Sequence, residues 1–118
     1  MTNLSEDHLV FESAAELFGL LSTPVRLKII SAVCNGDRNV SDLLAQIDTT
    51  QPNMSQHLAT LYRAGVLGRR REGTQIYYSL RSERVATLCR AVCSQVAVEL
   101  GGDNVLPAAD RLLRAVHR

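Results

Sequence analysis

Residues 50–78 read TQPNMSQHLATLYRAGVLGRRREGTQIYY, and the layout of the whole chain follows from this stretch. Thr50 is expected to be the N-cap of a helix, because its hydroxyl can accept from the unpaired backbone N–H groups of a first turn. Gly65 is expected to end that helix as its C′ residue. Between them, apolar residues recur at i, i+4 and i+7, which predicts one buried stripe: Met54, Leu58 and Leu61.

The opposite face of this helix carries amides and hydroxyls, where a solvent-facing helix usually shows Lys and Glu. Such groups can pair with base edges in the major groove of DNA. The helix is therefore interpreted as the recognition helix of a helix-turn-helix. Its predicted DNA-contacting residues are Thr50, Gln51, Asn53, Ser55, Gln56, His57 and Arg63.

After Gly65 the pattern changes to a period of two, which predicts two strands joined by a turn at Glu72-Gly73. Three consecutive arginines precede the turn, and arginines in such a place can bind phosphate. The hairpin is interpreted as the β-wing of a winged helix-turn-helix, and the alternative is a solvated surface hairpin. The predicted DNA contacts of the wing are Arg70, Arg71, Gly73 and Thr74.

Charge is distributed unevenly along the 118 residues, although the net charge is only +1. Residues 49–81 hold five arginines against Glu72 alone, a net charge of +4, so the rest of the chain carries −3. A basic segment on a mildly acidic body is typical of a DNA-binding domain.

The other elements predicted from periodicity and capping signals are all helical. Thr23 and Pro24 match an N-cap and N1 pair, and Ser82 can cap a helix that Gly101-Gly102 ends. The fold class is therefore mainly α with a two-stranded β-wing, as a single domain over residues 1–118. The predicted helices span about residues 5–21, 24–34, 40–47, 83–100 and 107–117.

Compartment and enzyme class can also be argued from composition. The acidic N-terminus lacks the apolar segment of a signal peptide, and no run reaches transmembrane length, so a cytoplasmic protein without membrane contact is expected. Its cysteines should then be reduced at rest. No cysteine has an active-site signature and no Gly-rich phosphate loop is present, so we expect neither an enzyme nor a cofactor.

This order of elements resembles the ArsR/SmtB family of winged helix-turn-helix repressors, over about residues 9–96. The resemblance implies a homodimer formed by the first and fifth helices, palindromic operator DNA and release of DNA by an inducer. The residues that carry it are Leu21–Leu27 with Ile29-Ile30, Val40–Leu43, Gln51–Leu58, Leu61–Leu67, Arg70–Gly73 and Tyr77-Tyr78.

The standard metal sites of that family are missing. Metalloid-responsive members carry Cys-Val-Cys-Asp-Leu in the third helix, whereas this chain has Asn39-Val40-Ser41-Asp42-Leu43. Zinc-responsive members carry histidines in the fifth helix, and residues 82–100 contain none. The resemblance therefore predicts no metal ligands of the standard kinds.

Other family members sense persulfides or oxidants through one cysteine in the second helix and one in the fifth. Cys34 and Cys93 resemble that pair, but Cys34 lies one turn later in its helix and Cys93 about one turn earlier. If the two helices pack antiparallel, these opposite shifts compensate and the two cysteines face each other. We therefore predict Cys34 and Cys93 as a switch that responds to reactive sulfur or oxidants. Passive packing and soft-metal or arsenite binding are the alternatives, and Cys89 is interpreted as a core residue.

Overall fold

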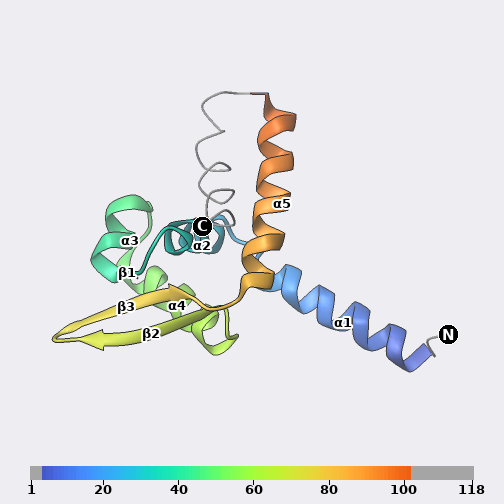
Figure 1. Ribbon diagram of the computed structural model, residues 1–118, viewed down its shortest axis with the longest axis horizontal. Helices are drawn as coiled ribbons and strands as arrows, with labels where there is room; N and C mark the ends of the chain where they lie inside the picture. The colour runs from blue at the N-terminus through green and yellow to red at the C-terminus, as the bar shows by residue number, and fades with distance from the viewer. Residues whose placement is uncertain (1–3, 102–118) are drawn as a thin grey trace.

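The computed structural model describes residues 4–101, so the predicted helix over residues 107–117 lies outside the described residues, and the extent of the single domain stays a prediction. The fold is mainly helical with a small antiparallel sheet (Figure 1). In chain order the elements are α1 (Leu4–Leu20), α2 (Pro24–Cys34), β1 (Arg38–Asn39), α3 (Val40–Gln46), α4 (Gln51–Arg63), β2 (Leu67–Glu72), β3 (Gln75–Leu80) and α5 (Glu83–Leu100).

Local capping signals explain why the helices begin where they do. The hydroxyls of Thr23, Thr50 and Ser82 each accept from the backbone N–H three residues later. Asn39 caps α3 in the same way, and the Asp42 carboxylate accepts in return from the Asn39 backbone N–H, which completes a capping box that the sequence analysis did not identify. The predicted bounds of α2 and α5 are confirmed.

The end of α4 satisfies its last carbonyl groups with a Schellman motif. Gly65 has φ +79°, its N–H donates to the Tyr62 carbonyl, and the Val66 N–H donates to the Leu61 carbonyl at 3.0 Å. This arrangement requires a left-handed residue at C′, which glycine adopts without steric cost. It turns the chain directly from the recognition helix into β2.

The sheet contains one strand more than the wing. β2 and β3 pair antiparallel with Glu72 opposite Gln75, and β1 adds to the other edge of β3, giving the order β1-β3-β2. The predicted turn is wrong by one residue, because the two turn residues are Gly73 and Thr74. Gly73 has φ +62°, and a glycine with positive φ at the first turn position is what a type II′ hairpin turn requires.

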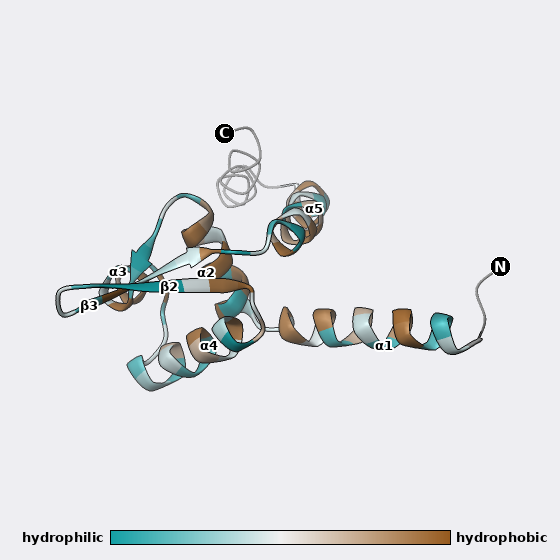
Figure 2. Cartoon of the chain, turned by 60° about the horizontal axis from the view of Figure 1, so that its bottom comes forward, coloured by the Kyte–Doolittle hydropathy of each residue, from teal (hydrophilic) through white to brown (hydrophobic). Residues whose placement is uncertain are grey.

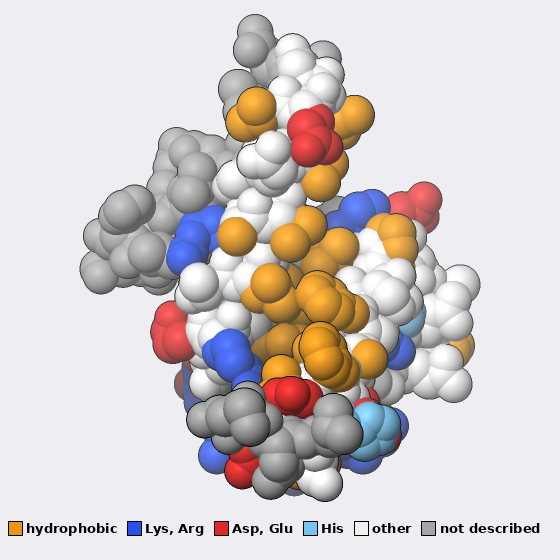
Figure 3. Space-filling view, turned by 90° about the vertical axis from the view of Figure 1, so that its right-hand side faces the viewer, with side chains coloured by type: hydrophobic (Ala, Val, Ile, Leu, Met, Phe, Trp, Pro, Cys, Tyr) orange, Lys and Arg blue, Asp and Glu red, His pale blue; other side chains and the backbone are white. Residues whose placement is uncertain are grey.

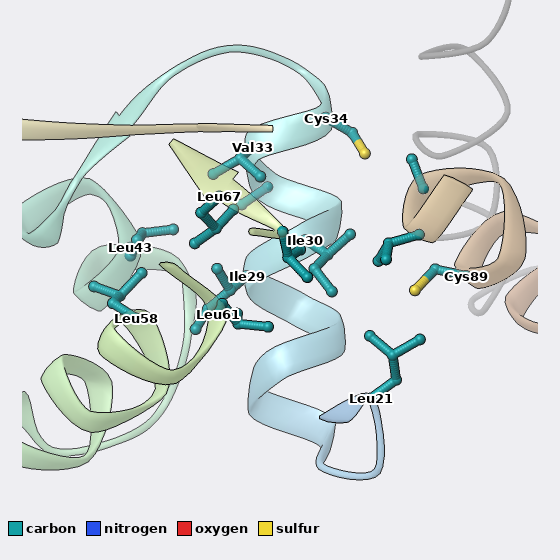
Figure 4. Close-up of a cluster of buried hydrophobic side chains, with 14 of the residues drawn as sticks. Leu21, Ile29, Ile30, Val33, Cys34, Leu43, Leu58, Leu61, Leu67 and Cys89 are labelled. Carbon is teal, nitrogen blue, oxygen red and sulfur yellow. The ribbon is translucent and has the colours of Figure 1, made fainter. Parts of the chain in front are cut away.

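The core lies between α2 and the elements around it (Figure 4). Six consecutive residues of α2, Ile29 to Cys34, are buried, so other elements cover this helix on more than one side. The stripe predicted for α4 is also confirmed, because Met54, Leu58 and Leu61 are fully buried. Each such side chain contributes about 1.5–3 kcal/mol by its removal from water.

In contrast, α1 extends away from this body, and α5 rises beside it (Figures 1 and 2). Hydrophobic side chains gather in one patch over α1 and along α5 (Figure 3). The large apolar residues left exposed on these helices are Leu9, Val10, Phe11, Phe18, Val92, Val96, Val98 and Leu100.

Within the described part of the chain, no single helix is long and apolar enough to cross a membrane. Only Ser5–Leu20 and Pro24–Cys34 reach that length and hydropathy together, and they are bent by 86° at the break between them.

Candidate nucleic-acid interface

The outward face of α4 presents the side chains predicted to contact bases. Gln51, Asn53, Ser55 and Gln56 are exposed, whereas the apolar stripe on the other side holds the helix against the core. The Thr50 side chain accepts from the Asn53 backbone N–H at 3.2 Å, so its first role is to cap the helix. The exposed amides retain the donors and acceptors that base edges require.

Alanine at Asn53 or Gln56 should relax the preference for operator DNA and leave binding to unrelated DNA nearly unchanged. An amide that pairs with both N6 and N7 of adenine contributes about 1–3 kcal/mol of discrimination, which corresponds to roughly 5- to 150-fold in relative affinity. Fluorescence anisotropy with operator and scrambled duplexes measures this ratio. Equal losses on both duplexes would instead assign these residues to phosphate contacts or to structure.

His57 is half-buried at the edge of this face and is held by a residue from another helix. Its Nδ1 accepts from Arg26 Nε at 3.1 Å, and the same guanidinium donates through Nη1 to the Leu20 carbonyl at 2.9 Å. Arg26 thus joins the end of α1, the first turn of α2 and the recognition helix. His57 is among the residues predicted from the sequence, whereas Arg26, which is 31 residues away in the chain, is not.

The three arginines of the wing have different surroundings. The Arg69 guanidinium lies 4.0 Å from the centre of the Tyr62 ring on α4, a cation–π contact that ties the wing to the recognition helix. Arg70 pairs with the carboxylates of Asp37 and Glu72 and lies 5.0 Å from the Tyr77 ring. Arg71, Gly73 and Thr74 are exposed toward the tip of the hairpin.

These surroundings distinguish Arg70 from Arg71, although both are predicted from the sequence as DNA contacts. Arg71→Ala should weaken specific and non-specific DNA binding together and reduce the salt slope, the dependence of log affinity on log salt, by about 0.9. Arg70→Ala should have a smaller effect, because two carboxylates already neutralise that charge. Asp37→Asn, which removes one of them, should raise affinity for any duplex. Titrations at several salt concentrations measure all three, and an unchanged slope in Arg71→Ala would place the wing off the DNA.

All three cysteines are thiols near the contact between α2 and α5. Cys34 and Cys89 are buried in the core, and their side chains point into the space between the two helices (Figure 4). Cys93 is half-buried and packs against the same core cluster. The predicted core position of Cys89 is confirmed.

Burial, together with smaller contributions from the negative charges of the Cys93 and Cys34 thiolates, raises the pKa of the Cys89 thiol to about 11. At neutral pH roughly one Cys89 in ten thousand is therefore a thiolate. Burial also raises the pKa of the Cys93 thiol. Because the thiolate is the reacting form, Cys89 is a poor nucleophile at rest.

Among residues 4–101, no three His, Cys, Asp or Glu side chains are grouped closely enough to hold a metal ion. His8 and Glu12 form a pair on the exposed surface of α1, with Nε2 and Oε1 3.0 Å apart.

Several known proteins are similar in sequence to this chain. Residues 23–67 match the sequence profile of the bacterial regulatory proteins of the arsR family. The HTH-type transcriptional regulator Rv0081 of Mycobacterium tuberculosis is 33% identical over 106 residues, which cover 89% of this chain and 92% of that protein. The biofilm growth-associated repressor of Agrobacterium fabrum is 37% identical over 78 residues, 66% of this chain and 67% of the relative. A probable mercury resistance operon repressor of Streptomyces lividans is 32% identical over 77 residues, 65% of this chain and 62% of that protein.

Solved structures share the fold. Reduced HlyU from Vibrio cholerae superposes with a TM-score of 0.71 at 26% identity, over 78% of this chain and 97% of that one. The transcriptional repressor BigR from Xylella fastidiosa superposes with a TM-score of 0.69 at 31% identity, over 79% of this chain and 95% of that one. A homodimeric winged helix-turn-helix DNA-binding domain, Mb0332 from Mycobacterium bovis, superposes with a TM-score of 0.66 at 26% identity, over 84% of this chain and 90% of that one.

These relatives are regulators of transcription rather than enzymes, and Rv0081 matches this chain over nearly its full length. The chain has the same winged helix-turn-helix, with its polar recognition face exposed on α4. The protein therefore belongs to the arsR family of bacterial transcriptional regulators.

Proposed function

We propose that this protein is a repressor that binds palindromic double-stranded operator DNA as a homodimer in the cytoplasm. The observation that carries the proposal is the exposed amide and hydroxyl face of α4, which lies next to a wing that bears three arginines. Two relatives described as repressors, from Agrobacterium and Xylella, support the direction of regulation.

The exposed apolar patch on α1 and α5 supports the dimer. Phe11 is 73% exposed and Phe18 62% exposed. Both residues belong to α1, the helix that projects from the core (Figure 2). Large contiguous apolar surfaces of this kind mark sites of protein association. The relative from Mycobacterium bovis is homodimeric. A second copy of this chain is therefore the proposed occupant of the patch.

Selection of bound duplexes from a random pool tests this function. The enriched sequences should be inverted repeats, because a twofold dimer presents two identical recognition helices. The centres of the half-sites should be about 34–36 Å apart, or a multiple of that distance. A pool that gains no inverted repeat after several rounds would contradict the proposal.

The proposed inducer is a reactive sulfur species or an oxidant that links Cys34 to Cys93. Both cysteines lie near the contact between α2 and α5. α2 lies beside the helix-turn-helix, and α5 belongs to the proposed dimer surface, so a bridge would connect these two parts of the protein. Of the two fifth-helix cysteines, Cys93 is the more accessible. A direct disulfide requires Cα atoms about 4.4–6.8 Å apart, and inserted sulfur atoms span a wider gap.

The second candidate is a repressor that releases DNA when its cysteines bind a metal or metalloid. The relative from Streptomyces lividans, a probable mercury resistance operon repressor, favours it. Mass spectrometry of the intact protein after separate exposure to peroxide, polysulfide, zinc and arsenite distinguishes the candidates. Loss of two hydrogens marks a disulfide and added sulfur masses mark a polysulfide bridge, whereas a retained metal or arsenic supports the second candidate.

A further inference from the structure

A polar pocket beside the recognition helix includes a guanidinium that comes from α2. Among the residues that the structure describes, no Asp or Glu lines this pocket, although two arginines do. Cations that share one pocket repel each other unless an anion binds between them. The lining residues are Arg26, Gln56, His57, Ala59, Thr60 and Arg63.

The position of Arg26 in its own helix opposes local electrostatics. Its backbone N–H donates to the Thr23 hydroxyl at 3.1 Å, which places it in the first turn of α2. The positive end of the helix dipole disfavours a cation there, and acidic residues are the usual occupants. Because the charge of Arg26 is unfavourable for α2 itself, its presence indicates a role in contacts outside this helix.

Arg26, which lines the pocket, has N–H donors that make no hydrogen bond within the described residues. A guanidinium has five N–H groups, and the bonds of Arg26 to His57 and to the Leu20 carbonyl use two of them. The other three have no partner among the described residues. An imidazole that accepts at Nδ1 carries its proton at Nε2, so His57 offers one donor more. The Thr60 hydroxyl is not available, because it donates to the Gln56 carbonyl at 3.0 Å.

We infer that this pocket binds one backbone phosphate of the DNA, with Arg26 as a contact from outside the helix-turn-helix. The inference rests on the proposed function. Gln56 lines the pocket and also belongs to the reading face, so a duplex that reaches Gln56 brings its sugar-phosphate backbone next to Arg26. A guanidinium binds a phosphate through two parallel N–H groups, which fixes the register of the duplex without reading its sequence.

The test is the salt dependence of DNA binding by Arg26→Gln. Loss of one phosphate contact should reduce the salt slope by about 0.9 on operator and scrambled duplexes alike. The affinity deficit of the variant should therefore shrink about threefold between 50 mM and 200 mM salt. Arg26→Lys keeps the charge but cannot keep both protein hydrogen bonds, and its slope should stay close to that of the wild type. Lys28→Gln removes an exposed charge two residues away on α2 and should leave the slope unchanged.

A purely structural role for Arg26 gives a different result. Arg26→Gln and Arg26→Lys would then weaken binding equally, with the wild-type slope, and the inference would be overturned. If the wild type shows no operator preference, the repressor proposal fails, whereas a slope loss on arbitrary duplex would still support the phosphate contact.

Discussion

Serine in place of Cys34 or Cys93 should give a protein that binds its operator with normal affinity and no longer releases it when polysulfide or peroxide is added. Both substitutions remove one end of the proposed bridge while changing side-chain size very little. Electrophoretic mobility shift before and after exposure to each reagent measures release. The expected effect is the complete loss of the response.

The size of that effect follows from the geometry of a dimer on DNA. A bridge would fix α2, next to the helix-turn-helix, to α5 at the proposed dimer surface. Half-sites are read in pairs separated by whole helical turns, so a change in the angle between subunits misplaces both recognition helices. To change a population from 1:99 to 99:1, the bridged state must favour the non-binding geometry by about 5.5 kcal/mol. A variant without the bridge has no such bias.

Cys89→Ser is the matched control for the switch. Cys89 is buried and its raised pKa keeps it protonated, so this variant should still release DNA. Normal release by Cys34→Ser would falsify the pairing. Loss of release in Cys89→Ser alone would move the bridge to Cys89, which lies within electrostatic range of both other thiols. Reduced protein that needs zinc to bind or release DNA would favour the metal candidate.

Aspartate at Phe18 or at Val96 should convert the dimer to a monomer and abolish operator binding at concentrations where the wild type is saturated. A twofold interface contains each substitution twice. Each copy loses about 1.5–3 kcal/mol of apolar burial, and an unpaired buried carboxylate adds a further cost. Dimer dissociation should therefore become at least about 100-fold easier.

Analytical ultracentrifugation measures the dimer, and anisotropy measures operator binding. Ala45→Asp introduces the same charge at an exposed residue of α3, which lies on the opposite side of the molecule from α1 (Figure 1). This control should remain dimeric. Phe18→Asp and Val96→Asp proteins that sediment as dimers would exclude the apolar patch as the interface.

The elements of this fold could be predicted from the sequence because the signals that determine them are local. A cap such as Thr23 or Thr50 acts on a backbone N–H only three residues away, and Gly65 ends α4 through its own positive φ. The reading face follows from the same local periodicity, because three buried residues determine which side chains of α4 face outward.

Only the tertiary structure determined the contacts between residues that are far apart in the chain. β1 has two residues, too few for a periodic pattern, and exists because it pairs with β3. In the sequence, Arg70 and Arg71 are equally suited to bind phosphate. In the fold, Arg70 pairs with Asp37, which is 33 residues away in the chain. Arg26 reached His57 in the same manner. Such pairs form because the packing of helices and strands brings separate segments together. The local propensities of the two residues do not determine how far apart they lie in the folded protein.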